Sequence, residues 1–295
     1  MRIEEGVPLS RFTTLGTGGP AGWFAEPETQ RELGEVLALA SERGLGVAVI
    51  GLGSNLLVAD AGVNMFVLRL RGELASVRVS HHRVFAGGGS PNAVVLHRAR
   101  GAGLSGFEFA CAIPGTVGGG VWMNAGAYGS DFAAVLVKAR VFTADGDQWL
   151  TPSQLEMTYR TSNLRHGQVV ADARLELTTR PEEEIKAAIR ALQSQRKAAQ
   201  PTNKRTFGSV FKNPEHELTA GRMLEACGLK GFRIGGAQIS PMHANFIENA
   251  GGASTDDALA LMVEARRRAY EQYGVVLTHE VEFLGLPELP PVGVE

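Results

Sequence analysis

The chain has 295 residues, of which 44% are hydrophobic and 20% are charged, a composition typical of a globular protein of about two domains. Its formal net charge of −2 excludes a bulk attraction to nucleic acid or to a membrane surface. The N-terminus lacks a signal-peptide core, no stretch of about twenty apolar residues is free of Gly and Pro, and the two cysteines lie far apart; we therefore expect a cytoplasmic protein without a membrane span, a disulfide framework or a metal site.

The first predicted elements are a helix and two strands. Residues 29–43 carry apolar side chains at helical spacing, with Thr29 placed to cap the helix and Gly44 to end it. Residues 47–50 and 63–70 are short apolar runs that predict strands. A glycine turn separates these two strands.

A strand that runs into a glycine loop is predicted at residues 81–91, HHRVFAGGGSP. Ser90 and Pro91 then open a helix, with Ser as the cap and Pro at the first helical position, and the helix should stop near Gly101.

The remaining predicted elements mix strands and helices without a regular rhythm, which favours an α+β fold over a doubly wound parallel sheet. Ser254 caps the last helix and Gly274 ends it. The expected strands are 135–142, 168–178, 274–278 and 280–285, and the expected helices begin at Pro181 and span 219–227 and 255–273.

The turn GLGSN at residues 51–55 presents consecutive backbone N–H groups beside small side chains. A dinucleotide-binding fingerprint would need a third glycine at Leu56 followed by a helix, whereas the next residues are strand-like, so we reject a Rossmann site. A tight turn between strands is one reading. The other is a site for an anion such as pyrophosphate, formed by Gly51, Gly53, Ser54 and Asn55.

A second glycine-rich segment, ACAIPGTVGGGVWMNAGAYGS at 110–130, combines bare backbone with apolar surface and has no charged side chain. Its apolar flank suits a flat aromatic ring, and its amides suit the polar edges of such a ring. Two distant loops that converge would fit a large cofactor with pyrophosphate and a heteroaromatic ring, whereas dense packing is the structural alternative. The candidate residues in this loop are Pro114, Gly115, Thr116, Gly118 and Gly119.

Several segments together resemble one known family, the UDP-N-acetylenolpyruvoylglucosamine reductases, flavoenzymes that make UDP-N-acetylmuramate for peptidoglycan. The resemblance covers roughly residues 10–285. The chain is similar to the shorter type of the family, because YRTS is followed by too short a connection for the extra loop and its substrate-covering tyrosine. The segments, in the order of the family, are RFTTLGTGG (11–19), GLGSNLLVAD (51–60), GFEFACAIPGTVGGGVWMNAGAYG (106–129), YRTS (159–162), GSVFKNP (208–214) and LTHEVEFLG (277–285).

The resemblance implies an FAD-binding fold of the vanillyl-alcohol-oxidase (PCMH) type in two α+β subdomains, 1–70 and 71–200, and a smaller α+β substrate-binding domain at 201–295. It implies an FAD-dependent UDP-N-acetylmuramate dehydrogenase of the cytoplasm, acting in cell-wall biogenesis and thereby in cell shape and cell division. NADPH delivers hydride to FAD and leaves, UDP-N-acetylglucosamine enolpyruvate takes its place, and flavin N5 passes the hydride to its methylene carbon. We expect a monomer without a nucleic-acid or membrane partner.

Hydride addition to an enolpyruvyl double bond drives negative charge into the neighbouring carboxylate, so the site needs a strong cation there and a proton source at the adjacent carbon. By resemblance, Arg160 of YRTS is the active-site arginine, Ser209 of GSVFKNP is the proton donor and Glu280 of LTHEVEFLG is the active-site glutamate. Strand alternation would place Glu280 on the same side as Thr278 and Glu282. Without the motifs, each would read as a surface or turn residue.

Contacts to the UDP-sugar are also assigned by resemblance. Lys197 and Asn213 match the substrate-binding lysine and asparagine of the family, with Lys212 and Asn245 as weaker candidates. Tyr128 is placed either beside the flavin or in the core, and a lone His243 receives no role.

Two other functions remain open on the sequence. One is a flavin oxidase on the same scaffold that oxidises a sugar or an alcohol; GSVFKNP and HEVEFLG argue against it, because such an oxidase needs no proton donor opposite an arginine–glutamate pair. The other is a nucleotide-sugar binding module without catalysis.

Overall fold

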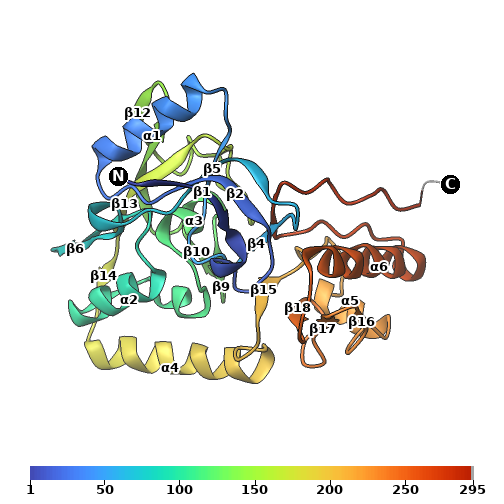
Figure 1. Ribbon diagram of the computed structural model, residues 1–295. Helices are drawn as coiled ribbons and strands as arrows, with labels where there is room; N and C mark the ends of the chain where they lie inside the picture. Colours follow the sequence, from blue (N-terminus) through green and yellow to red (C-terminus); the bar gives the residue numbers. More distant parts are fainter. Residues whose placement is uncertain (294–295) are drawn as a thin grey trace. The chain divides into compact units, whose positions relative to one another are not determined.

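A computed structural model describes residues 1–293 and divides the chain into two compact units, each assembled from segments that are distant in sequence. The last boundary, between Arg196 and Lys197, falls within α4 (Glu182–Ala199). Unit 1 comprises Met1–Val7, Ala21–Leu52 and Asn64–Arg196, and unit 2 comprises Pro8–Pro20, Gly53–Val63 and Lys197–Glu295. Figure 1 labels many of their elements.

Unit 1 contains two larger sheets and two short strand pairs. The first sheet, β1-β2-β5-β3, consists of Ile3–Pro8, Pro20–Ala25, Val63–Leu68 and Val47–Val49, with β3 and β5 parallel. The second, β12-β11-β13-β7-β6, is antiparallel and consists of Gly146–Leu150, Leu136–Thr143, Val169–Glu176, Arg83–Gly87 and Val77–Ser80. The pairs are β9 (Gly126–Ala127) with β10 (Ser130–Asp131), and β8 (Leu104–Ser105) with β14 (Thr178–Thr179).

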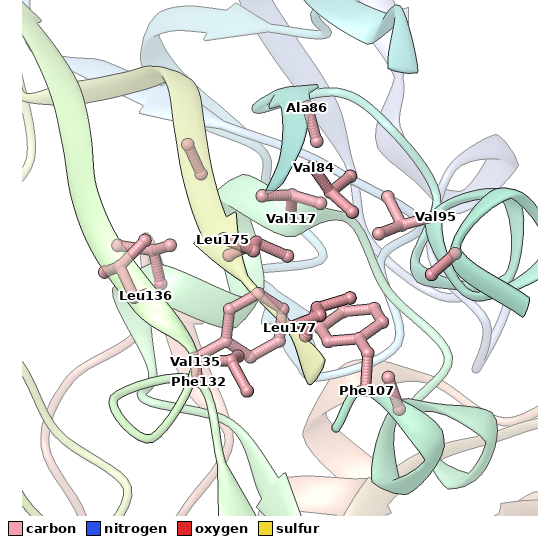
Figure 2. Packing of buried hydrophobic residues seen from close by; sticks show 14 of the residues in the cluster. Val84, Ala86, Val95, Phe107, Val117, Phe132, Val135, Leu136, Leu175 and Leu177 are labelled. Atoms are coloured by element: carbon pink, nitrogen blue, oxygen red, sulfur yellow. The ribbon is translucent and has the colours of Figure 1, made fainter. Parts of the chain in front are cut away.

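The main core of unit 1 lies where the five-stranded sheet meets the helices α2 (Asn92–Gly101), α3 (Val117–Trp122) and α4. Side chains from β7, β13 and α2 gather around aromatic rings (Figure 2), and Phe107 and Phe132 meet edge to face at 5.5 Å between ring centroids. Helix α1 (Gln30–Glu42) belongs to a second core, which it forms with residues of β5 and the adjacent strands. These two cores fix the sheets on which the functional loops are mounted.

The expected helix ends follow from local hydrogen bonds. In α1 the Thr29 side chain accepts from the Glu32 N–H, and Gly44 follows with a φ of 64°. In α6 (Thr255–Tyr273) Ser254 forms a capping box with Asp257, and Gly274 ends the helix at a φ of 67°. Both helices confirm predictions that depended only on neighbouring residues.

The predicted Ser90 cap and the predicted strand at 274–278 are wrong. Helix α2 begins at Asn92 with Pro91 as its N-cap, and the Ser90 hydroxyl donates to the Ser76 carbonyl at 2.9 Å instead of capping the helix. Residues 274–278 form no strand; the Thr278 carbonyl accepts one bond, from the Lys212 N–H, instead of entering a ladder. In each case a distant backbone group overrides the local preference.

Unit 2 has an antiparallel sheet, β15-β18-β17-β16, formed by Thr206–Ser209, Phe246–Asn249, Ala237–Ile239 and Arg233–Ile234. Helix α6 packs on β16 and β17 and contacts α5 (Ala220–Ala226), as Figure 1 shows. Strand β19 (Glu282–Leu284) pairs in parallel with β4 (Leu56–Val58). Leu15 and Leu57 are fully buried in the core of this unit, which explains why 8–20 and 53–63 join the C-terminal segment.

Neither a membrane span nor a disulfide is found in the part of the chain that the structure describes. No helix within residues 1–293 is both long and apolar enough to cross a bilayer. Cys111 and Cys227 are free, and burial raises the pKa of both thiols. Both are therefore expected to be neutral thiols at pH 7.

Candidate functional site

The two glycine loops predicted to converge meet within unit 1, where Gly51 lies against Thr116. A Cβ built on Gly51 would come within 2.6 Å of the Thr116 hydroxyl oxygen, so no side chain fits there. Thr116 is buried and caps α3 by accepting from the Gly119 N–H. The structure therefore brings Gly51, two residues after β3, onto the N-cap of α3, as a site shared by the two loops requires.

Packing explains some glycines of the second loop and leaves one unexplained. A Cβ on Gly118 would lie 2.9 Å from the Gly88 carbonyl oxygen, and one on Gly120 would enter the Phe132 ring. Gly119 between them is exposed, and its Cβ would meet nothing nearer than 3.7 Å. Dense packing therefore requires two of the three, whereas Gly119 offers bare backbone at an open surface, which suits the close approach of a cofactor.

In unit 2, the turn residue Asn55 is bonded to the segment that carries Glu280. The Asn55 Nδ2 donates to the Glu280 carbonyl at 3.1 Å, and the Asn55 carbonyl accepts from the Glu282 N–H at 3.1 Å. Gly53, at a φ of 62°, lies so close to Phe12 that no side chain fits. Asn55 therefore positions Glu280 in addition to the cofactor role predicted for it, a connection that the sequence did not reveal.

Ser209 lies immediately after a glycine bulge in β15. Thr206 pairs with Glu248 and Ser209 with Phe246, so the strand carries one extra residue relative to β18, and Gly208 supplies a φ of 84°. Such bulges redirect the side chains beside them. A Cβ on Gly208 would lie 3.3 Å from the Ser54 carbonyl oxygen, which brings the predicted cofactor turn to the main chain next to Ser209.

Glu280 is adjacent to the serine segment through the backbone, but it does not lie in a strand. Its N–H donates to the Val210 carbonyl at 2.8 Å, one residue after Ser209. Strand β19 begins only at Glu282, so the expected strand alternation of Thr278, Glu280 and Glu282 is wrong. The bonds to Val210 and Asn55 hold Glu280 in an irregular segment instead.

Asn245, which directly precedes β18, binds the backbone just after Ser209. It is 4% exposed, its Oδ1 accepts from the Phe211 N–H at 2.9 Å, and its Nδ2 donates to the Phe211 carbonyl at 2.8 Å. The Asn245 carbonyl also accepts from the Val210 N–H. This is a structural role next to Ser209, for a residue that the sequence ranked only as a weak substrate contact.

Arg160 lies in unit 1, in a tight turn between Thr158 and Thr161, whose backbone groups bond to each other in both directions. Its φ is 55°, a conformation that costs a non-glycine residue energy and is concentrated at functional sites. The Arg160 Nη2 donates to the Gly126 carbonyl at 2.6 Å. The structure thus places Ser209 near Glu280 within one unit and Arg160 in the other, and their joint action remains a prediction.

The two predicted substrate contacts lie near the ends of two different helices: Lys197 at the end of α4 and Asn213 beside the start of α5. Lys197 is exposed in the last turn of α4. Asn213 accepts from the Ala220 N–H at 3.1 Å, at the start of α5. Their roles toward a UDP-sugar remain predictions.

Two further residues singled out in the sequence have defined surroundings. Tyr128 is 45% exposed and its hydroxyl donates to the Leu192 carbonyl at 3.2 Å, so it is not a core residue. His243 accepts from the Asn245 N–H through Nδ1, and burial lowers its pKa. With a lowered pKa, His243 is neutral at pH 7 and its ring nitrogen holds the backbone N–H of Asn245.

Comparisons with known proteins show which families the chain resembles. Residues 21–151 match the FAD binding domain family, and residues 200–284 match the C-terminal domain of UDP-N-acetylenolpyruvoylglucosamine reductase. The chain is 43% identical over 293 residues to UDP-N-acetylenolpyruvoylglucosamine reductase 2 of Symbiobacterium thermophilum, covering 98% of this chain and 95% of that relative. The corresponding values for reductase 1 of Bacillus cereus are 41% identity over 287 residues, 96% and 95%. The crystal structure of UDP-N-acetylenolpyruvylglucosamine reductase from Thermus caldophilus matches with a TM-score of 0.85 and 39% identity, over 96% of this chain and 99% of that one.

Proposed function

The chain belongs to the UDP-N-acetylenolpyruvoylglucosamine reductase family and has its α+β FAD-binding fold, and from this premise we propose that it reduces UDP-N-acetylglucosamine enolpyruvate to UDP-N-acetylmuramate with NADPH as the reductant. FAD, when bound, would supply the hydride relay from NADPH to the methylene carbon of the enolpyruvyl group. The other requirements of the reaction fall on side chains of this chain: binding the substrate, stabilising the developing charge and delivering a proton.

The residues of unit 1 fit the cofactor that the family requires. Gly51 and Thr116 meet without an intervening side chain, and Gly119 leaves bare backbone at an open surface. We assign the cofactor to these residues together with Gly53, Ser54 and Asn55 of the turn and with Pro114, Gly115 and Gly118 of the second loop. Backbone N–H groups in such turns suit pyrophosphate and polar ring edges.

The roles of the three catalytic residues follow from the charge that develops on the substrate. Arg160 binds the substrate carboxylate, because a guanidinium stays charged and pairs with a carboxylate through two parallel bonds. Ser209 delivers its proton to the carbon that bears the carboxylate. Glu280 would face the substrate carboxylate and share a proton with it, since two bare carboxylates in contact would repel each other.

One observation carries this proposal. The turn that includes Ser54, the bulge before Ser209 and the segment of Glu280 come from three distant parts of the chain, and unit 2 joins them by backbone contacts. A glycine bulge lies directly before Ser209, and the buried Asn245 binds the backbone of Phe211, two residues after it. The arrangement is what a proton donor beside a glutamate and a cofactor loop would need.

The remaining assignments extend the same proposal. Lys197 and Asn213 would bind the diphosphate and sugar of the substrate. The protein would act as a monomer in the cytoplasm, where UDP-sugars and NADPH are available. Light scattering of the FAD-loaded protein would test the oligomeric state, with one chain per particle as the expected mass.

The proposal is tested by measuring its two half-reactions separately under anaerobic conditions. Ser209→Ala should leave bleaching of the flavin by NADPH near normal and slow its recovery on adding the enolpyruvyl substrate by several orders of magnitude, because the proton source is lost. Thr206→Val is the matched control: Thr206 lies in the same strand, and its buried hydroxyl has no hydrogen-bond partner. That variant should perform both half-reactions at the rates of the unsubstituted protein.

Three results would count against the proposal. Equal losses in both half-reactions of Ser209→Ala would contradict the assigned proton donor. A protein that binds FAD but is not bleached by NADPH would exclude NADPH as the reductant. A flavin that is bleached but does not recover with the enolpyruvyl substrate would exclude the proposed reaction.

A further inference from the structure

Asn124 is a buried polar residue in unit 1 that no step of the proposed reaction uses. It follows the end of α3, is 2% exposed and has a φ of 40°, the left-handed region that asparagine tolerates better than most residues. Its side chain binds two separate loops. The Oδ1 accepts from the Ala133 N–H at 2.9 Å, while the Nδ2 donates to the Thr158 carbonyl at 2.9 Å and to the Asp131 carboxylate at 3.2 Å.

The bond to Thr158 fixes the first residue of the turn that carries Arg160. Thr158 and Thr161 bond to each other across the turn, and Arg160 occupies the position whose positive φ usually demands glycine or asparagine. The residue just after the turn is bound to α3 as well, because the Ser162 hydroxyl donates to the Trp122 carbonyl at 2.6 Å. Both ends of the turn are therefore attached to the last residues of α3 and those just after it.

The guanidinium of Arg160 is held by the same frame. It donates to the Gly126 carbonyl, and Gly126 pairs with Asp131, the carboxylate that accepts from Asn124. A Cβ on Gly126 would lie 2.6 Å from the Ser130 carbonyl oxygen and 3.0 Å from the Arg160 Nη1, so a side chain there would push the guanidinium away. Asn124 thus fixes the backbone of Arg160 through Thr158 and supports its guanidinium through Asp131 and Gly126.

We propose that Asn124 is a positioning residue for Arg160, holding the strained turn on the end of α3 whose first turn belongs to the candidate cofactor loop. The inference rests on the carboxylate-binding role proposed for Arg160. Its consequence is that the guanidinium is set relative to Thr116 and Gly119 by one short, rigid helix. Loss of the amide would relax the turn and move the guanidinium without removing it.

The test uses Asn124→Gly in the FAD-loaded protein, because glycine keeps the left-handed backbone and removes the side chain that carries the amide. FAD content and bleaching by NADPH should stay within about twofold of the unsubstituted protein. Recovery with saturating UDP-N-acetylglucosamine enolpyruvate should slow about 100-fold, the cost typical of a misplacement of roughly 1 Å. The control is Asn163→Ala, which removes another side-chain amide close to the turn. The Asn163 Nδ2 donates to the Gln154 carbonyl and not to the turn of Arg160, so this variant should leave recovery unchanged.

A double substitution separates positioning from a general structural effect. If Asn124 acts through Arg160, the pair Asn124→Gly with Arg160→Ala should recover no more slowly than Arg160→Ala alone. Multiplied losses, or a single Asn124→Gly variant that behaves like Asn163→Ala, would overturn the positioning role while leaving Arg160 catalytic. Normal recovery in Arg160→Ala would instead refute the carboxylate-binding role proposed for Arg160, and the inference with it.

A second variant covers the case in which Asn124→Gly yields no folded protein. Ser162→Ala removes the other attachment of the turn, and it should slow recovery about tenfold with FAD content unchanged. Its effect should also disappear in the Arg160→Ala background. A Ser162→Ala variant that recovers at the normal rate would contradict the proposed frame.

Discussion

At the scale of single residues, three asparagines connect this fold to its proposed chemistry. Asn55 binds the backbone of Glu280, Asn124 binds the turn of Arg160, and Asn245 binds Phe211 beside the Ser209 strand. An amide has both a donor and an acceptor, so it can replace a missing strand partner in irregular backbone. Catalytic groups held in loops and bulges need such support, because no ladder of backbone bonds fixes them.

A single carboxylate also provides the clearest expectation for pH. Glu264 of α6 accepts two bonds at 2.8 Å from Arg267 and one at 2.6 Å from Arg268. These bonds lower the pKa of Glu264 from 4.5 to about 2, and the bonds from Arg267 have the largest effect. Because the pKa is lower in the folded state, the stabilisation is complete above pH 4.5 and is lost as the pH falls toward 2.

Glu264→Gln should therefore lower the free energy of unfolding by about 0.5–1 kcal/mol at pH 7, the range for a partly exposed pair. The difference from the unsubstituted protein should shrink steadily between pH 4.5 and 2. Urea unfolding at pH 7, 4.5 and 3 measures it, with Glu217→Gln, at an exposed site, as the control. An equal difference at pH 7 and pH 3 would show that the ion pairs are not its cause.

At the scale of elements, a comparison of two helical glycines distinguishes a glycine that only destabilises its helix from one that we assign to the cofactor site. Gly34 in α1 and Gly119 in α3 both have room for a Cβ. A Cβ added to Gly34 would have no neighbouring side chain or distant backbone within 4 Å, and one added to Gly119 would have only the Thr116 hydroxyl. Glycine in a helix costs about 0.5–1 kcal/mol relative to alanine. Folding alone would therefore favour alanine at both positions.

Gly34→Ala and Gly119→Ala should each stabilise the FAD-free protein by about 0.5–1 kcal/mol. Only Gly119→Ala should weaken FAD binding, by about tenfold or more, because its methyl group would occupy the open backbone surface proposed for the cofactor. Urea unfolding of the FAD-free protein and a fluorescence titration with FAD give the two quantities. The cofactor assignment of Gly119 fails if both variants bind FAD equally well.

At the scale of the whole molecule, the sequence predicted what depends on neighbouring residues or on a complete motif. The ends of α1 and α6 followed from their caps, and the α+β class followed from the irregular order of elements. The Ser90 cap and the strand around Glu280 were wrong because distant backbone groups decided them. The amide bonds of Asn124 and Asn55 were missed, because nothing in the neighbouring sequence shows which distant carbonyl an asparagine will bind.

The discontinuous composition of unit 2 is the largest feature that local patterns did not contain. Its core includes Leu15 and Leu57, both fully buried, and β19 depends on β4 for its parallel partner. The Thr255 hydroxyl at the start of α6 also donates to the Val58 carbonyl at 2.7 Å. The C-terminal segment therefore lacks part of its own core and one strand of a pair.

Residues 197–295 expressed alone should consequently fail to unfold cooperatively, although a family domain matches most of this stretch. Removing two fully buried leucines costs several kcal/mol, which is of the same order as the whole stability of a small domain. Circular dichroism should show a broad, shallow thermal change, and a hydrophobic dye should bind. A fragment that also carries residues 8–20 and 53–63 on flexible linkers should regain a sharp transition. A sharp transition in the short fragment would mean that the two N-terminal segments rest on a core that is complete without them.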